Sequence, residues 1–321
     1  MNNQLLALGL PTFKRPDFAI QLIADAVGLE IYDEIIVSCN SRELSIESFI
    51  DSLGPASTVI YNLQNENVGL SQNYSDIISL STCRYIHIVS DEDSLDAQNA
   101  KELYKFIENS DIQPGVICLS VLDQFGEIYK DTSIQTNKNI KNICSDAGHI
   151  GATAINREQW NANSINLFAQ YSQRLGSVYP TVAAAILAYA MNPQLIYFPK
   201  HIVKMGPQHK KSEIKGHSIY GFSSRAFQLM SLIDLVLATR ISGLYRVVFY
   251  MIYFFSSHAF IDSYIKFEED ILILTNRCLM QKDFSTLAKI SLIFAVNFFY
   301  IIRLYRLLRS HISESLKPFI K

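Results

Sequence analysis

The first 120 residues alternate short apolar runs with segments whose apolar residues recur at helical spacing. This alternation is typical of β-α-β units built around a mostly parallel sheet. The sequence therefore predicts an α/β fold of the nucleotide-binding kind. The expected strands lie at about residues 5–10, 34–39, 58–61, 85–89 and 116–119.

Helical spacing is clearest in two segments of this region. The segment 16–29 starts with a proline at a helix N-terminus and carries an apolar face, formed by Phe18, Leu22, Ile23, Ala26 and Val27. The segment 70–81 is expected to turn a second face inward, formed by Leu70, Tyr74, Ile77 and Ile78. Further along, a polar loop is expected at 128–144, a strand at 149–156 and a helix beginning at Pro180.

Beyond residue 226 the chain becomes more apolar, which predicts a helical region over 226–321. Segments 246–258 and 289–303 have uncharged cores of 11 and 13 residues, short of the roughly 20 that cross a bilayer. The basic ending with Arg303, Arg306 and Arg309 favours helices that lie on an anionic membrane surface. The alternatives are helices packed in a soluble core or a homo-oligomer interface, and membrane-spanning helices.

Composition narrows the function. Apolar residues make up 49% of the chain and charged residues 18%, below the usual proportion of about 25% charged. A net charge of −2 argues against nucleic-acid binding. The five cysteines form no C-x-x-C pair, which favours a reducing compartment. The N-terminus lacks the pattern of a signal peptide, so we expect a cytoplasmic protein.

Three consecutive carboxylates, Asp91, Glu92 and Asp93, directly follow the expected strand at 85–89. Open α/β sheets bind ligands at the carboxyl ends of their strands. Carboxylate oxygens are also the ligands that Mg²⁺ or Mn²⁺ prefers. The triplet therefore suggests a metal site, although an acidic triplet can also be a solvated turn.

Four segments in order resemble the GT-A-fold glycosyltransferases of family 2: LPTFKRPD, EIIVSCNS, NENVGLSQN and YIHIVSDED. The resemblance covers residues 5–96, and GHIGATAINREQW more loosely resembles the acceptor-side strand of that family. It implies a Rossmann-like nucleotide-diphospho-sugar transferase domain over 1–225, with a donor-binding half at 1–100 and an acceptor-side half at 101–225.

The resemblance also implies roles for individual residues. Asp93 would ligate Mg²⁺ or Mn²⁺, Asp91 would assist the metal or touch the ribose, and Glu92 would lie near the donor sugar. Asn40 stands where the family commonly has an aspartate, so it offers neutral hydrogen bonds instead. The other expected donor-binding residues, which could instead be turn, cap or strand-end residues, are Pro11, Thr12, Arg15, Asn67, Gly69 and Asn73.

The general base is harder to assign. The family often places an aspartate on the helix after the acceptor strand, but residues 159–212 contain no Asp or Glu. Asp146 is the first candidate, Glu158 the second and Asp123 the third. Each could equally be an ordinary surface carboxylate.

Four more residues are candidates for substrate or metal contacts. His217, or His209, in a basic segment could be a third metal ligand or a phosphate contact. That segment could also be a solvated loop or a basic patch facing the membrane. Trp160 and Tyr171 could stack on a sugar, although aromatic residues are more often part of a core.

These observations predict a metal-dependent, inverting glycosyltransferase that moves a sugar from a nucleoside-diphosphate-sugar to a glycan. A lipid-linked oligosaccharide acceptor, at the inner face of the cell membrane, would fit the synthesis of a bacterial surface polysaccharide such as O-antigen or capsule. Two alternatives remain. A sugar-nucleotide nucleotidyltransferase should show a glycine-rich loop that GLPTFKRPDF lacks, and a non-catalytic membrane-associated scaffold could share the fold.

Overall fold

The computed structural model contains two compact units, Met1–Gln173 with Tyr179–Lys211, and Arg174–Val178 with Ser212–Lys321. Each unit is described by itself. The predicted domain boundary after residue 225 falls inside the first helix of the second unit, α8 (Phe222–Thr239). The structure describes residues 4–55, 57–123, 147, 149–174, 180–206, 222–239, 248–249, 251–253, 255–256, 260, 271–282 and 284–316.

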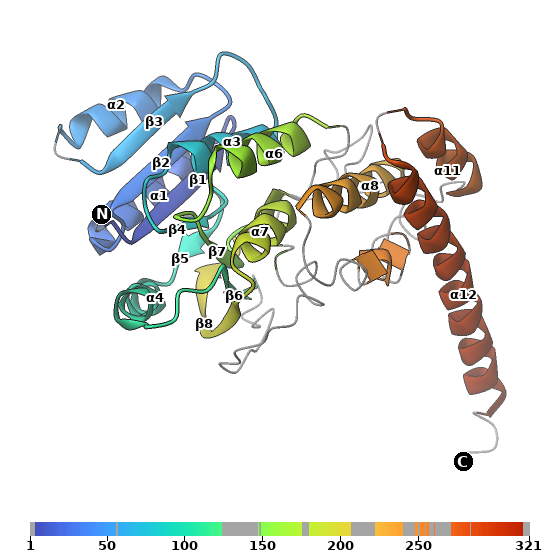
Figure 1. Cartoon of the computed structure of the whole chain (residues 1–321). Coiled ribbons are helices and arrows are strands. Elements are labelled where there is room, and N and C mark those ends of the chain that lie inside the picture. The colour runs from blue at the N-terminus through green and yellow to red at the C-terminus, as the bar shows by residue number, and fades with distance from the viewer. Residues whose placement is uncertain are drawn as a thin grey trace. The chain divides into compact units, whose positions relative to one another are not determined.

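Eight strands form one sheet in the first unit: β1 (Leu6–Thr12), β2 (Glu34–Cys39), β3 (Val59–Leu63), β4 (Tyr85–Ile88), β5 (Ser94–Leu95), β6 (Val116–Leu122), β7 (Thr153–Asn156) and β8 (Leu195–Lys204). Their order across the sheet is β3-β2-β1-β4-β7-β6-β8-β5 (Figure 1). The first four strands in this order are parallel, and β7 is antiparallel to both β4 and β6. β6 and β8 are parallel, and β5 is antiparallel to β8.

The described helices of the first unit are α1 (Pro16–Leu29), α2 (Leu44–Ser52), α3 (Leu70–Leu80), α4 (Ala97–Asn109), α6 (Ala162–Ser172) and α7 (Pro180–Met191). Side chains of α1 and α4 share a buried cluster with Leu6, Leu8 and Leu10 of β1. On the opposite face α3 packs on β1, while α7 packs on β7. Gly9 lies on this second face, where a Cβ would overlap Ile77 of α3, so glycine permits the close approach of the helix.

Much of the predicted pattern is confirmed. Strand β2 and helix α1 have the predicted bounds, the other five predicted strands are present, and α7 begins at Pro180. The strand predicted at 149–156 is shorter in the structure, where β7 begins at Thr153. The residues expected to face inward from α3 are buried except Leu70, which is exposed, as is Phe18 of α1. Both exceptions lie in the first turn of their helices.

Three elements escape the pattern for identifiable reasons. Helix α2 buries only Ile46 among its residues, and α4 buries only Ala100, Leu103 and Ile107, so few apolar residues mark either helix in the sequence. Strand β8 pairs with β6 through register shifts around Ser120, which interrupt a regular alternation. The expectation of a mostly parallel sheet is confirmed, since six of the eight strands run in one direction, but apolar alternation does not reveal that β7 and β5 run in the other.

The second unit is helical in its described part. Helix α8 packs on α11 (Ile271–Leu279) and α12 (Thr286–Leu316). Arg174 joins its short segment to α8 by an ion pair of 3.0 Å with Asp234. The apolar segment 289–303 lies within α12, whereas 246–258 is described only in part. Within the described residues, every helix is too short or too polar to cross a membrane.

His87 of β4 is a buried titratable group beneath the candidate site. Its Nε2 donates to the carbonyl of Gly151 at 3.0 Å, and its Nδ1 has no hydrogen-bond partner among the residues described. Burial lowers the pKa of His87 to about 4, because the cation would lose its hydration. The imidazole is therefore neutral in the folded protein at neutral pH.

This burial predicts a specific loss of stability in acid. Between pH 6.5 and about 4 the unfolded chain binds a proton at His87 that the folded chain does not, so stability falls as the pH is lowered through this window. We expect His87→Gln, which can still donate to Gly151, to remove about 3 kcal/mol of that loss. Urea unfolding followed by the fluorescence of Trp160, the single tryptophan, measures it. Parallel stability curves for the two proteins between pH 7 and 4 would contradict the prediction.

Candidate active site

The candidate site lies at the carboxyl ends of β1, β2 and β4. Because these strands are parallel, Thr12, Asn40 and the acidic triplet come to the same edge of the sheet. The backbone N–H of Asn40 donates to the carbonyl of Thr12 at 2.9 Å, which joins the ends of β1 and β2. The structure thus brings together residues that are 79 positions apart, as the contact of Thr12 with Asp91 shows.

Asp91 is held on both of its carboxylate oxygens. Thr12 Oγ1 donates to Oδ2 at 2.7 Å and Arg15 Nη1 donates to Oδ1 at 3.2 Å. Asp91 is only 5% exposed, so these contacts offset the cost of burying its charge. Its orientation is consequently set before any ligand arrives.

Arg15 binds carboxylates in this structure. Its Nη1 donates to Glu92 at 2.8 Å as well as to Asp91. The turn that carries it is strained, since Lys14 has a left-handed backbone with φ of 56°, and Ser41 Oγ accepts a bond from the Lys14 N–H at 3.0 Å. We expected Arg15 to reach a base or phosphate, but here it neutralises part of the triplet.

Asp93 differs from Asp91 because one of its carboxylate oxygens accepts no hydrogen bond from the described residues. The N–H of Gly206 donates to Oδ1 at 3.0 Å, whereas Oδ2 is buried and has no partner among the described residues. Burial, opposed by the bond from Gly206 and increased by Glu92 and Asp91, raises the pKa of Asp93 to about 7. A buried carboxylate with an unused oxygen is a group that a cation would stabilise.

Gly206 makes this arrangement possible. It follows β8, and a Cβ at this position would overlap the backbone carbonyl of Glu92. Only glycine lets the chain pass close enough for its N–H to reach Asp93. Sequence reasoning missed Gly206, because nothing in the sequence links it to a residue 113 positions away.

The residues present fit a divalent cation in part. Mg²⁺ is commonly held by one or two carboxylates together with substrate phosphates and water. Asp93 Oδ2 could be such a ligand, and both carboxylate oxygens of the nearby Asp91 already accept hydrogen bonds. In the described parts of the chain, no cluster of three or more His, Cys, Asp or Glu side chains could hold a metal by itself. A cation here would therefore depend on oxygens from a substrate.

Several predicted donor-binding residues make hydrogen bonds within the protein. Asn73 is buried in α3, where its Oδ1 accepts from Ser38, and Asn67 Oδ1 accepts from the N–H of Gly69. Gly69 has φ of 81° at the start of α3, a conformation that favours glycine. Asn40, also buried, accepts from the Val68 N–H at 3.4 Å. The donor-binding roles of these residues stay predictions.

Pro11 does not end its strand, because β1 continues through it to Thr12. Strand β4 pairs with β1 only as far as Gly9, so the missing N–H of Pro11 costs no bond to β4.

The strand directions place the two described candidates for the base, Glu158 and Asp123, at opposite edges of the sheet. Glu158 follows β7, which is antiparallel to β4, and therefore lies beside Arg84 at the amino end of β4, paired with it at 3.2 Å. The structure does not bring Glu158 to the triplet. Asp123 follows the carboxyl end of β6, where the Met205 N–H donates to Leu122 next to Gly206. Asp123 thus arrives at the site edge. Asp146 lies outside the described residues.

The remaining candidates do not enlarge the site. His217 and His209 also lie outside the described residues. Trp160 and Tyr171 are buried around Phe168, with ring centroids 5.9 and 6.1 Å from it, so they belong to the core and not to a sugar-stacking surface.

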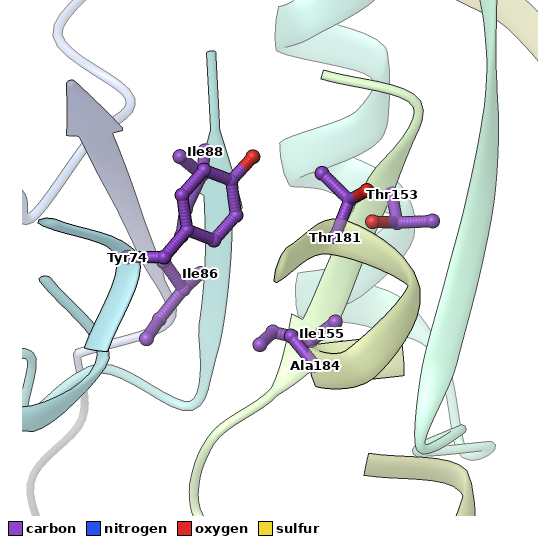
Figure 2. A pocket seen from close by; sticks show the side chains of 7 residues that line it. All are labelled: Tyr74, Ile86, Ile88, Thr153, Ile155, Thr181 and Ala184. Carbon is purple, nitrogen blue, oxygen red and sulfur yellow. The ribbon is translucent and has the colours of Figure 1, made fainter. Parts of the chain in front are cut away.

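A small pocket opens between α3 and α7 over β4 and β7 (Figure 2). Its cavity volume is only about 10 Å³, and no carboxylate lines it in the described structure. Tyr74 reaches up along β4, and its buried hydroxyl has no partner among the described residues. Burial and the Asp93 carboxylate raise the pKa of Tyr74 well above its usual value. Tyr74 therefore stays protonated and can donate a hydrogen bond, but it cannot act as a base. Lining residues are Tyr74, Ile86, Ile88, Thr153, Ile155, Thr181 and Ala184.

The different surroundings of Asp91 and Asp93 predict opposite effects of one substitution. Asp91→Asn weakens the bonds from Thr12 and Arg15 and should destabilise the protein by about 1–3 kcal/mol. Asp93→Asn removes a buried charge beside two other carboxylates and should stabilise the metal-free protein by roughly 1 kcal/mol. Urea unfolding in the presence of a chelator, followed by Trp160 fluorescence, compares the two. Two shifts of the same sign would show that the two carboxylates are not held differently.

The fold of this chain is similar to solved structures, although its sequence is not similar to known sequences. No protein-family model matches the sequence, and a search of curated protein sequences finds no match. Among solved structures, S. aureus TarS 1–349 in complex with UDP-GlcNAc superimposes with a TM-score of 0.66 at 9% identity, over 92% of this chain and 88% of TarS 1–349. The complex with UDP gives 0.64 at 8% identity over the same shares, and TarS 1–349 without a named ligand gives 0.63 at 9% over 86% and 79%. The chain therefore has the GT-A glycosyltransferase fold.

Proposed function

We propose that this protein is a glycosyltransferase that moves a sugar from a nucleoside-diphosphate-sugar to a glycan. The observation that carries the proposal is Asp93, a buried carboxylate with an unused oxygen at the carboxyl end of β4. In a GT-A fold this edge of the sheet is where a ligand would lie. S. aureus TarS, which shares the fold, has been solved with UDP-GlcNAc and with UDP, and this supports a nucleotide-sugar as the donor class.

A diphosphate would supply the metal-binding oxygens that the protein residues of the site do not. Asp93 Oδ2 would hold Mg²⁺ or Mn²⁺, with Asp91 beside it, and the donor phosphates would supply further oxygens. Such an ion, when bound, would neutralise the charge that develops on the departing nucleoside diphosphate. Thr12 and Arg15 keep Asp91 oriented, and the Gly206 N–H keeps Asp93 in place.

Inversion by direct displacement needs a base that takes the proton of the acceptor hydroxyl. Of the candidates, Asp123 is the described carboxylate that the topology supports, because β6 delivers it to the edge where Asp93 lies. Asp146 remains a candidate from the sequence.

The acceptor we propose is a lipid-linked oligosaccharide at the inner face of the cell membrane, in the synthesis of a bacterial surface polysaccharide such as O-antigen or capsule. Its support is the apolar and basic character of the C-terminal third. A reaction at the membrane surface would bring the enzyme to an acceptor held by its lipid.

Donor binding and transfer test the proposal. A nucleoside-diphosphate-sugar should raise the melting temperature in Mn²⁺ and much less in a chelator, because a bound donor stabilises the folded state. Asp93→Asn should abolish this shift and lower the rate of donor hydrolysis by roughly 100-fold or more. Asp111→Asn is the matched control, since Asp111 is exposed before the amino end of β6, at the opposite edge of the sheet.

The same assay separates the alternatives. Stabilisation by a nucleoside triphosphate and release of pyrophosphate would indicate a nucleotidyltransferase. No shift with any nucleotide, with or without metal, would indicate a non-catalytic scaffold. Asp123→Asn should lower transfer while leaving the donor-induced shift intact, and an unchanged transfer rate would exclude Asp123 as the base.

A further inference from the structure

One side of helix α12 presents large apolar side chains to solvent along its first half. Their exposed fractions lie between 37% and 62%. Monomeric soluble proteins rarely expose contiguous apolar patches of this kind. We call this set the outer stripe: Leu287, Ile290, Ile293, Phe294, Phe298 and Ile301.

The other side of the same half is already packed. Ala288, Leu292, Ala295 and Phe299 are buried within the second unit, and Ser256 Oγ donates to the carbonyl of Ala295 at 2.8 Å. The outer stripe is therefore not the face that α12 uses for its own core. Asn297, the exposed polar residue within the stripe, turns its amide back to the carbonyl of Ile293 at 2.9 Å, so it leaves the stripe apolar.

The outer stripe runs from Leu287 to Ile301, a length of about 21 Å at 1.5 Å per residue. The helix backbone continues beyond it to Leu316, and the sequence of this part contains Arg303, Arg306 and Arg309.

The charge of this helix favours one occupant over another. From residue 284 to 313 the sequence has Lys289, Arg303, Arg306 and Arg309 and no Asp or Glu. A second copy of the chain packed along the stripe would bring arginines together with no carboxylate between 284 and 313 to pair with them. An anionic lipid surface would pair with them. The uncharged run before Arg303 has 13 residues, whereas a helix needs roughly 20 apolar residues to cross a bilayer.

We propose that the outer stripe of α12 binds the surface of an anionic lipid bilayer, to which the basic sequence that follows the stripe is attracted. This goes beyond the proposed transfer reaction, because it assigns a binding surface in the second unit. It would hold the protein where a lipid-linked acceptor is found. Vesicle binding requires neither donor nor metal, so its outcome is independent of the outcome of the transfer assay.

Flotation of the full-length protein with vesicles tests the proposal. We expect binding to vesicles of phosphatidylglycerol and phosphatidylcholine, weaker binding to phosphatidylcholine alone, and release at high salt. The triple variant Ile290→Ser, Phe294→Ser, Ile301→Ser should bind at least tenfold more weakly. Its matched control is Leu44→Ser, Leu80→Ser, Ile112→Ser, which removes three exposed apolar side chains of the first unit and should bind as the wild type does.

The charge is tested separately. Arg303→Gln, Arg306→Gln, Arg309→Gln should lose the preference for anionic vesicles but keep part of the apolar attachment. Circular dichroism and the donor-induced melting shift check that each variant is folded. The proposal is overturned if the wild type does not float with anionic vesicles, or if the stripe variant floats equally well. It is also overturned if light scattering shows that the wild type is a dimer that does not bind lipid and that the stripe variant is a monomer.

Discussion

The site depends on the burial of carboxylates that repel one another at the end of β4. Asp91 is 5% exposed and Asp93 is 8% exposed, and two negative charges so close together are unfavourable away from water. The fold compensates the two buried charges unequally. Thr12 and Arg15 satisfy Asp91, whereas Asp93 receives one bond from Gly206 and keeps a buried oxygen without a partner in the described structure. The energetic cost remaining at Asp93 is what a cation with a diphosphate would remove.

The sheet topology delivers the partners of the triplet from distant parts of the chain. Parallel pairing of β1 and β4 brings Thr12 and Arg15 to Asp91. The return of β8 beside β6 brings Gly206 to Asp93, and the absence of a side chain lets the two backbones touch. The one antiparallel strand next to β4, β7, sends its own carboxyl end to the other edge. The topology therefore places Asp123 at the edge of the sheet where the triplet lies, and Glu158 at the opposite edge.

Much of the first unit could be predicted from local pattern. The strands at 34–39 and 85–88 and the helix at 16–29 follow from apolar spacing, and the triplet could be predicted as a candidate ligand site because it directly follows a strand. Helices α2 and α4 were not predicted, since each buries few residues. Roles of single amides are harder to predict, because an amide that bonds within the protein, as Asn73 does, and an amide that faces a ligand look alike in sequence.

The sequence by itself determined where β1 to β4 and the helices α1 and α3 lie, that carboxylates follow the fourth strand, and that the C-terminal part is apolar and basic. These are properties of neighbouring residues, and period and composition encode them. Only the tertiary structure decided that Asp93 and not Asp91 has the unused oxygen, that Gly206 supports it, and which side of α12 stays uncovered. Those outcomes depend on strand direction and on contacts between residues more than 70 positions apart, which the spacing of apolar residues along one segment does not record.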